Sequence, residues 1–302
     1  MIVVSLVRMA FQALIANKLR SGLTLLGVII GVTSVMTIIS ALEGMMDAIA
    51  SDLERLGPAT FIATTLGGVV TSDEQWHEML KRKALDLEAV RDIEAGCNLC
   101  DKVSPRTNSW ARVKYGNKSL RGVRVAGSTS SLIEIVDIEV AQGRFHSAED
   151  DAHRRQVVFI GDFIRETFFE GIDPLNKELN VSGKKYTVIG VGKKQGAIFG
   201  ENRDNYIMIP LSTHLKQFGQ PRKNLAFFIK ALSVEQLKEA IDQVRVILRS
   251  RRHVPFDKPD DFSILTADEL LSALNNVTRI FRLGLVGISS ISLVVGGIVV
   301  MN

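Results

Sequence analysis

The sequence predicts an α+β fold in which transmembrane helices flank one large domain. Two long uncharged runs lie at residues 21–42 and 283–302, and residues 43–282 between them carry alternating strand and helix patterns. Hydrophobic residues make up 46% of the 302-residue chain although 23% of it is charged. Membrane-spanning segments reconcile these two values.

The first uncharged run has 22 residues between Arg20 and Glu43. As a helix it is about 33 Å long at 1.5 Å per residue, which matches a hydrocarbon core about 30 Å thick. A buried core helix rarely continues so far without a charge, and the apolar stretch of a cleaved signal peptide is shorter. We therefore predict a transmembrane helix at residues 21–42.

The second uncharged run, residues 283–302, is 20 residues long and predicts a second transmembrane helix, at whose end the chain stops. Residues 1–20 place apolar side chains at helical spacing, which predicts an amphipathic helix on the cytoplasmic membrane surface. A simple extension of the first span explains that spacing equally well.

The flanking charges predict the orientation of the chain. Residues 1–20 contain Arg8, Lys18 and Arg20 and no acidic residue, whereas acidic residues begin at Glu43 on the other side of the first span. The positive-inside rule then places the N-terminus in the cytoplasm and residues 43–282 outside it. With two spans, this orientation predicts a multi-pass membrane protein with an extracytoplasmic domain.

The domain pattern predicts short strands, two hairpins and helices. Gly116-Asn117 and Ser182-Gly183 are the predicted hairpin turns. The predicted strands cover residues 60–66, 110–127, 156–160, 177–194, 206–212, 224–232 and 262–266. The predicted helices cover residues 85–96, 162–169, 234–252 and 267–302, and the first span continues past Glu43 as a helical stalk.

Two pairs of residues have the spacing of a capping box, in which a Ser or Thr and a Gln or Glu three residues later start a helix. Ser233 with Gln236 opens the helix at 234–252, and Thr266 with Glu269 opens the helix that continues into the second span.

No motif predicts catalysis, nucleotide binding or a cofactor in this chain. The phosphate-binding loop, the G-x-S-x-G turn and the H-E-x-x-H helix do not occur in the sequence. The net charge of +4 includes no basic block, so nucleic-acid binding is not expected. In "HSAEDDAH" (146–153), Glu149, Asp150 and Asp151 have the chemistry to hold a cation, but Ser147 followed by three acids favours a capped helix start.

Cys97 and Cys100 form the remaining candidate site, in "CNLC". A C-x-x-C pair can indicate thioredoxin-like chemistry, but here it follows a helix and precedes a strand, which is the wrong order. In an oxidising compartment a local disulfide is the favoured interpretation, and two unpaired cysteines in a turn are the alternative. The glycine-rich residues 191–205 predict a solvated loop, with partner contact as the alternative.

Several segments together resemble the permease component of MacB-type ABC transporters, a family related to LolC-like lipoprotein-releasing permeases and to FtsX. They are "NKLRSGLTLLGVIIGVTSVMTIISALEG", "GRFHSAEDDAHRRQVVFIGDFIRETFF", "DPLNKELNVSGKKYTVIGVG", "IMIPLS" and "TRIFRLGLVGISSISLVVGGIVVMN". The resemblance implies a porter-like part at about residues 43–126 and 224–266 and a Sabre-like part at about 127–223, on helical stalks. It also implies that the chain is truncated within its second span.

The resemblance further implies a location in the bacterial inner membrane with the domain in the periplasm, as well as the function and the partners. These are a homodimer or permease heterodimer, a separate cytoplasmic ABC ATPase that binds ATP and Mg, and a periplasmic adaptor protein. We expect a permease that couples ATP hydrolysis to motion of the outer domain, for export or extraction of a drug, peptide or lipoprotein. The alternatives are an FtsX-like regulator of a cell-wall hydrolase and a two-span ligand sensor. Cys97 and Cys100 are not part of the family pattern.

Overall fold

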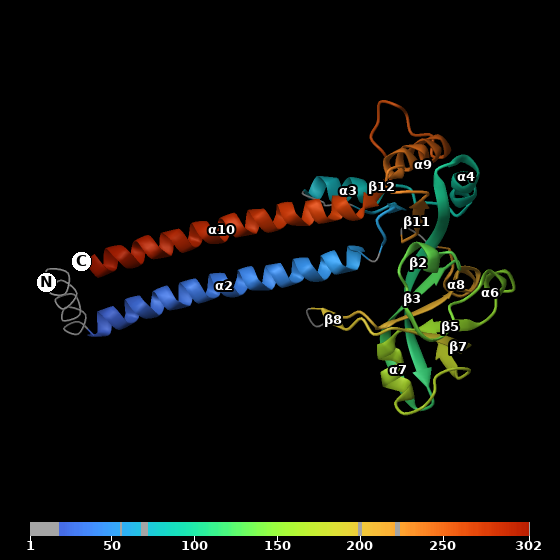
Figure 1. Cartoon of the computed structure of the whole chain (residues 1–302), viewed down its shortest axis with the longest axis horizontal. Helices are drawn as coiled ribbons and strands as arrows, with labels where there is room; N and C mark the ends of the chain where they lie inside the picture. Colours follow the sequence, from blue (N-terminus) through green and yellow to red (C-terminus); the bar gives the residue numbers. More distant parts are fainter. Residues whose placement is uncertain (1–17, 55, 68–71, 199–200, 221–223, 302) are drawn as a thin grey trace. The chain divides into compact units, whose positions relative to one another are not determined.

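A computed structural model describes residues 18–54, 56–67, 72–198, 201–220 and 224–301 (Figure 1). The chain forms two compact units, one made of Met1–Ile49 with Ser272–Asn302 and the other of Ala50–Leu271. The amphipathic helix predicted at 1–20 lies almost entirely outside the described residues, so it stays a prediction.

The first unit consists of parts of two long helices. Helix α2 covers Lys18–Glu54 and helix α10 covers Ala267–Met301, and both continue into the second unit. Within the first unit the Arg282 guanidinium lies 3.5 Å from the Glu43 carboxylate. The long, uninterrupted helices that the sequence predicts at both ends of the domain are therefore confirmed.

One helical segment of the described residues, Ile29–Ser51, is long and apolar enough to cross a membrane, with a mean hydropathy of 1.7. It overlaps the predicted span at 21–42, and α2 stays helical beyond Glu43 as far as Glu54. The predicted second span, 283–302, is helical up to Met301, but most of its side chains lie outside the described ones.

The second unit is built around one mixed sheet and several short helices. Its strands are β1 Thr60–Thr64, β2 Cys100–Tyr115, β3 Lys118–Ser128, β4 Val140–Gly143, β5 Val157–Ile160, β6 Glu178–Val181, β7 Lys184–Gly192, β8 Ala197–Ile198, β9 Glu201–Asn202, β10 Tyr206–Pro210, β11 Ala226–Ala231 and β12 Ser263–Thr266. Its helices are α3 Asp73–Lys81, α4 Glu88–Gly96, α5 Leu132–Ile135, α6 Ala148–Ala152, α7 Asp162–Phe169, α8 Leu211–Phe218 and α9 Leu237–Arg251.

The main sheet has the strand order β12-β1-β11-β2-β3-β10-β5-β7-β4, and β6 pairs with both β2 and β7. Most neighbours are antiparallel, but β10 runs parallel to β3 and β5 runs parallel to β7. Strands β8 and β9 form a separate small hairpin. This mixture of strands and helices confirms the predicted α+β class.

The two largest hydrophobic cores of the described residues lie against different parts of this one sheet. In the first core α4 and α9 contribute Ile93 and Val244, which pack with Phe61 and Phe227 of the strands. The second core contains side chains of α7, β5, β7 and β10, among them the fully buried Tyr186.

The long strand β2 takes part in both cores, through Val103 in the first and Val113 in the second. The sheet is continuous at the predicted porter-like to Sabre-like boundary near residue 127, which falls inside β3. The two cores are therefore joined by the hydrogen bonds of the strands that they share.

Several predicted elements are confirmed, and others differ in extent. Ser182 and Gly183 have φ values of 47° and 93°, the left-handed pair that a tight two-residue hairpin turn needs. Strand β2 begins at Cys100, ten residues before the predicted start. Helix α9 begins at Leu237, because Ser233 makes only a weak 3.4 Å contact with the Gln236 N–H and the segment between them is a turn.

Candidate functional site

The place where the two long helices join the sheet is the first candidate site. Strand β1 follows α2 and strand β12 comes directly before α10, and these two strands pair antiparallel at one edge of the sheet. Phe61 is opposite Thr266, and Thr64 is opposite Ser263. The entry and exit of the domain are thus held together by one hydrogen-bonded ladder.

A side-chain network reinforces this edge. The Ser263 hydroxyl accepts a hydrogen bond from the Arg82 guanidinium at 2.9 Å and donates one to the Gly67 carbonyl at 3.0 Å. Arg82 also donates to the Thr65 carbonyl at 3.2 Å. The segment after β1 is therefore tied to β12 by polar contacts as well as by the strand ladder.

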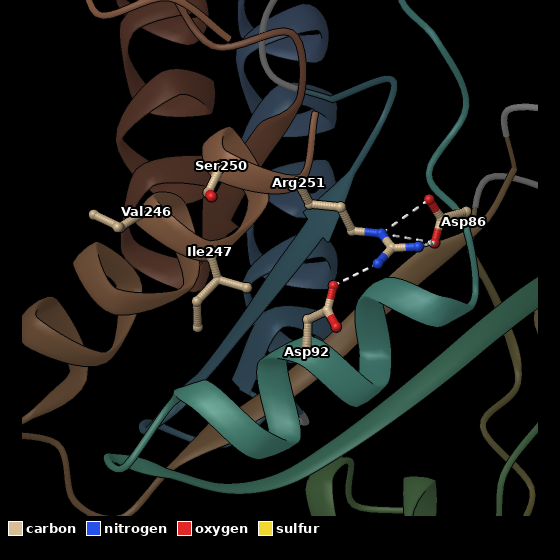
Figure 2. A pocket seen from close by; sticks show the side chains of 6 residues that line it. All are labelled: Asp86, Asp92, Val246, Ile247, Ser250 and Arg251. Carbon is tan, nitrogen blue, oxygen red and sulfur yellow. Dashed lines mark hydrogen bonds and ion pairs between the residues drawn. The ribbon is translucent and has the colours of Figure 1, made fainter. Parts of the chain in front are cut away.

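A groove of about 660 Å³ between α4 and α9 is the second candidate site. Figure 2 shows Arg251 of α9 reaching toward Asp86 and Asp92 on the α4 side. The Arg251 guanidinium lies 3.0 Å from Asp86, 2.8 Å from Glu88 and 2.5 Å from Asp92. Three carboxylates around one guanidinium leave this end of the groove with surplus negative charge.

The charges of this groove are strongly coupled. The hydrogen bonds that the Arg251 guanidinium donates to Asp86, Asp92 and Glu88 raise the pKa of Arg251 above its usual value. Burial by itself raises the pKa of the Asp86 carboxyl, but the hydrogen bonds from Arg251 and from the Ala89 N–H outweigh it and hold that pKa below its usual value. The network therefore ties α4 to α9.

Sequence reasoning missed this groove. Glu88 and Asp92 are one helical turn apart, so an acidic face on α4 was visible from the spacing. Their partner Arg251 is more than 150 residues further along the chain, and only the folded sheet brings the two helices together.

The two cysteines lie at the end of α4 and the start of β2. Their Cα atoms are 5.5 Å apart and their Sγ atoms are at bonding distance, 1.97 Å. Cys97 is buried in the first core, and the Asn98 N–H donates a 3.0 Å hydrogen bond to the Gln243 side chain of α9. Whether the protein carries this disulfide in the cell stays a prediction, tested below.

The "HSAEDDAH" segment starts a helix, as the sequence predicts. Ser147 and Asp150 form a capping box at the beginning of α6. Asp150 also lies 2.6 Å from Arg144 and 3.2 Å from Arg155, and these contacts outweigh its burial and hold its pKa well below the usual range. Among the described residues no group of three or more His, Cys, Asp or Glu side chains is arranged to hold a metal ion.

The histidines at either end of that segment lie in different environments. His146 is buried, and its Nε2 lies 3.0 Å from the Ser128 carbonyl. His153 is exposed, and its Nδ1 lies 2.9 Å from the Glu149 carbonyl. The two histidine side chains therefore contact different backbone carbonyls in different environments.

The glycine-rich residues 191–205 fold back on an aspartate. The buried Asp204 carboxylate accepts hydrogen bonds from the Gln195 N–H at 2.9 Å and the Gly196 N–H at 2.8 Å. Strands β8 and β9 follow this turn as a short hairpin. The described part of the segment is therefore organised by specific contacts.

Comparison with known proteins agrees with this architecture. The family described as the MacB-like periplasmic core domain matches residues 21–247. The Macrolide export ATP-binding/permease protein MacB of Bdellovibrio bacteriovorus is 28% identical over 298 residues, which cover 97% of this chain and 45% of that protein. The protein of the same name from Bordetella avium is 30% identical over 297 residues, which cover 98% of this chain and 43% of that one.

Solved structures share the fold at lower identity. The periplasmic region of MacB from Actinobacillus actinomycetemcomitans has a TM-score of 0.61 at 19% identity and covers 76% of this chain and 98% of that one. The extracellular domain of the noncanonic ABC-type transporter YknZ from Gram-positive bacteria has a TM-score of 0.54 at 16% identity, and covers 68% of this chain and 100% of that one.

The chain spans less than half the length of the curated relatives it matches. The family match, in contrast, covers most of this chain, including β1 and α4, and it ends within α9, before β12. The chain therefore belongs to the family of the MacB-like periplasmic core domain.

Proposed function

We propose that this chain is the permease part of an ABC transporter of the MacB type, which couples ATP hydrolysis to motion of an extracytoplasmic domain. The observation that carries the proposal is the pairing of β1 with β12, the strands that follow α2 and precede α10. The printed names of the relatives, which are macrolide export ATP-binding/permease proteins, support the assignment to ABC transport.

The proposed mechanism is mechanical. A shift of α10 along its axis moves Thr266, because helix and strand follow each other without a loop. Strand β12 passes the displacement to β1 and β11 through the ladder of antiparallel hydrogen bonds. The packed first core then moves with these strands, since close-packed interiors transmit displacement.

The partners and the location belong to the same proposal. A cytoplasmic ABC ATPase binds ATP and Mg and performs the hydrolysis, and this chain itself has no enzymatic role. The permease works as a homodimer or heterodimer in the lipid of the bacterial inner membrane, crosses it more than once, and contacts a periplasmic adaptor. Its N-terminus lies in the cytoplasm, its domain lies outside, and the cargo is a drug, peptide or lipoprotein.

The test is to interrupt the junction without disturbing the domain. Two glycines inserted between Thr266 and Ala267 should uncouple α10 from β12, because they remove the direct strand-to-helix continuity. The matched control carries the same insertion after Phe256, whose side chain is fully exposed. Both variants are purified with the ABC ATPase and assayed in lipid vesicles for ATP hydrolysis stimulated by drugs, peptides or lipoproteins.

We expect stimulation in the unmodified chain and in the Phe256 control, and loss of stimulation with retained basal hydrolysis in the junction variant. Equal stimulation of the junction variant contradicts the mechanical route. If no cargo stimulates the unmodified complex and the domain instead binds a cell-wall hydrolase, the FtsX-like regulatory role replaces the export role.

A further inference from the structure

Two arginines lie on the same face of the sheet, on its central strands. Arg106 of β2 is opposite Ser128, and Arg124 of β3 is opposite Trp110. Directly opposed residues of paired strands project to the same side. Val103 of β2 belongs to the first core, and side chains alternate between the two faces of a strand, so Arg106 projects from the other face.

Each guanidinium lies near an aromatic ring. The Arg106 Cζ is 5.4 Å from the centre of the Phe228 ring, and the Arg124 Cζ is 5.8 Å from the centre of the Tyr206 ring. Such stacking favours a cation and leaves the nitrogen-bearing edges of the guanidinium available for hydrogen bonds.

Hydrogen-bonding groups at this place are left without partners. The Nε atoms of Arg106 and Arg124 and the Oδ1 atom of Asn108 are buried and have no hydrogen-bond partner. Asn108 lies on β2 between Arg106 and Trp110, and Trp110 is the residue opposite Arg124. Leaving a buried polar atom unpaired is unfavourable, so three such atoms together favour a polar group supplied from outside the chain.

The two positive charges also lack a counter-ion. Within the described part of the chain neither guanidinium forms an ion pair with a carboxylate. Burial and the like charge of Arg124 lower the pKa of Arg106 to about 10, which still leaves it protonated at neutral pH.

Other arginines of the same domain are neutralised by close carboxylates. Arg252 lies 2.6 Å from Asp261, and Arg144 lies 2.6 Å from Asp150. The unpaired arrangement of Arg106 and Arg124 is therefore not the rule for arginines in this domain.

We propose that Arg106 and Arg124 bind an oxyanion, the carboxylate or phosphate group of a ligand from outside the chain. A guanidinium presents a planar fork of N–H donors that fits the two oxygens of such a group. The Trp110 side chain, on the same face, is 69% exposed and offers an apolar surface for the rest of the ligand. The inference does not depend on the transport proposal, because it concerns binding without the ATPase.

The test measures binding to the full chain in detergent. Inorganic phosphate and acetate are titrated at constant ionic strength, and binding is followed by calorimetry and by the thermal unfolding midpoint, since a ligand of the folded state raises that midpoint. The variants are Arg106→Gln and Arg124→Gln. Arg121→Gln is the matched control, because Arg121 is an exposed arginine of the same strand β3.

We expect phosphate to raise the midpoint of the unmodified chain and of the Arg121 variant, and each of the other two variants to bind at least tenfold more weakly. An arginine with a purely structural role lowers the midpoint on replacement but leaves the shift caused by phosphate unchanged. Three outcomes overturn the proposal. Neither anion changes the midpoint of the unmodified chain, or phosphate raises the midpoint of the Arg106 and Arg124 variants as much as that of the unmodified chain. The third is that the Arg121 variant loses phosphate binding to the same extent as the other two.

Arginine-to-lysine variants serve if the glutamine variants fail to fold. They keep the charge and lose the fork, so they are expected to bind phosphate more weakly than the unmodified chain, and binding of equal strength counts against the site. Nanodiscs of phosphatidylcholine, with and without phosphatidylglycerol, identify the source of the anion. A phosphate effect that phosphatidylglycerol abolishes assigns the site to a lipid headgroup, and an effect that persists assigns it to a soluble ligand.

Discussion

Thr266 and Glu269 hydrogen-bond each other in both directions where β12 becomes α10. The Glu269 N–H donates to the Thr266 hydroxyl at 3.1 Å, and the Thr266 N–H donates to the Glu269 carboxylate at 3.1 Å. Replacing Thr266 with alanine leaves the Glu269 N–H without its side-chain acceptor and should cost about 1 kcal/mol of unfolding free energy. Urea unfolding of the full chain in detergent measures this loss.

The matched control for the helix cap is Ser233→Ala. Ser233 contacts the Gln236 N–H at only 3.4 Å, so its replacement should cost clearly less than that of Thr266. Equal losses in the two variants contradict the assignment of Thr266 as the stronger cap.

The Cys97–Cys100 pair should be oxidised in protein taken from the cell envelope. Mass spectrometry with and without reductant checks this, and a free-thiol signal from both residues contradicts it. A bond that closes so short a loop should contribute about 2 kcal/mol through the entropy of the unfolded chain. Replacing both cysteines with alanine should lower stability by a similar amount, and reductant should then have no further effect.

Arg251 should contribute to stability through its carboxylates. Replacing it with glutamine leaves Asp86, Glu88 and Asp92 to repel each other, and we expect a loss of about 1–2 kcal/mol that shrinks in 1 M salt. Lys81→Gln is the control, because its ion pair with Glu78 is largely exposed and should contribute less than about 0.5 kcal/mol. A loss that does not change with salt contradicts an electrostatic origin.

His214 should make the stability of the domain depend on pH. It is buried, and this burial outweighs the raising effect of the Val125 backbone and lowers its pKa to about 4. The folded pKa is below the unfolded value of about 6.5, so the unfolded chain binds more protons between these values. Stability is therefore fully present above pH 6.5 and falls as the pH drops toward 4.

The His214→Phe variant should lose part of that pH dependence. Phenylalanine keeps a flat ring against Phe218, and thermal unfolding between pH 8 and 4.5 gives the slopes. His153→Gln is the control, because His153 is exposed, and its slope should match that of the unmodified chain. The pKa of His146 is also lowered, mainly by burial, so a residual slope is expected. An unchanged slope in the His214 variant contradicts the prediction.

Features that depend on a few neighbouring residues could be predicted from the sequence. The Ser182-Gly183 hairpin and the Ser147 helix cap follow from local backbone preferences, and both are present. Helix α3 was not predicted, because its short polar pattern resembles a loop. Its sequence signal was Ser72, whose side chain accepts a hydrogen bond from the Gln75 N–H at the start of the helix. Helix α8 follows Pro210 without a side-chain cap, and nothing local marks its start.

Features that depend on distant residues could not be predicted. Arg251 and Asp86 are 165 residues apart in the chain, and the parallel pairing of β10 with β3 joins segments that no turn connects. Arg106 and Arg124 lie on the same face only because β2 and β3 stay paired up to Arg106, which is opposite Ser128. Hydrophobic periodicity reports which side of a strand is buried but not which strand lies next to it.

Because β1 and β12 are adjacent, the domain could be removed from the chain as one continuous segment. Because Phe61 and Thr266 are opposite each other, the two ends of the inserted segment are separated by about 5 Å, one strand spacing. A turn of a few residues could bridge that gap, so deleting the whole domain would require no other change in the chain. The same closeness would allow such a domain to be gained by, or exchanged between, helical hairpins of unrelated proteins.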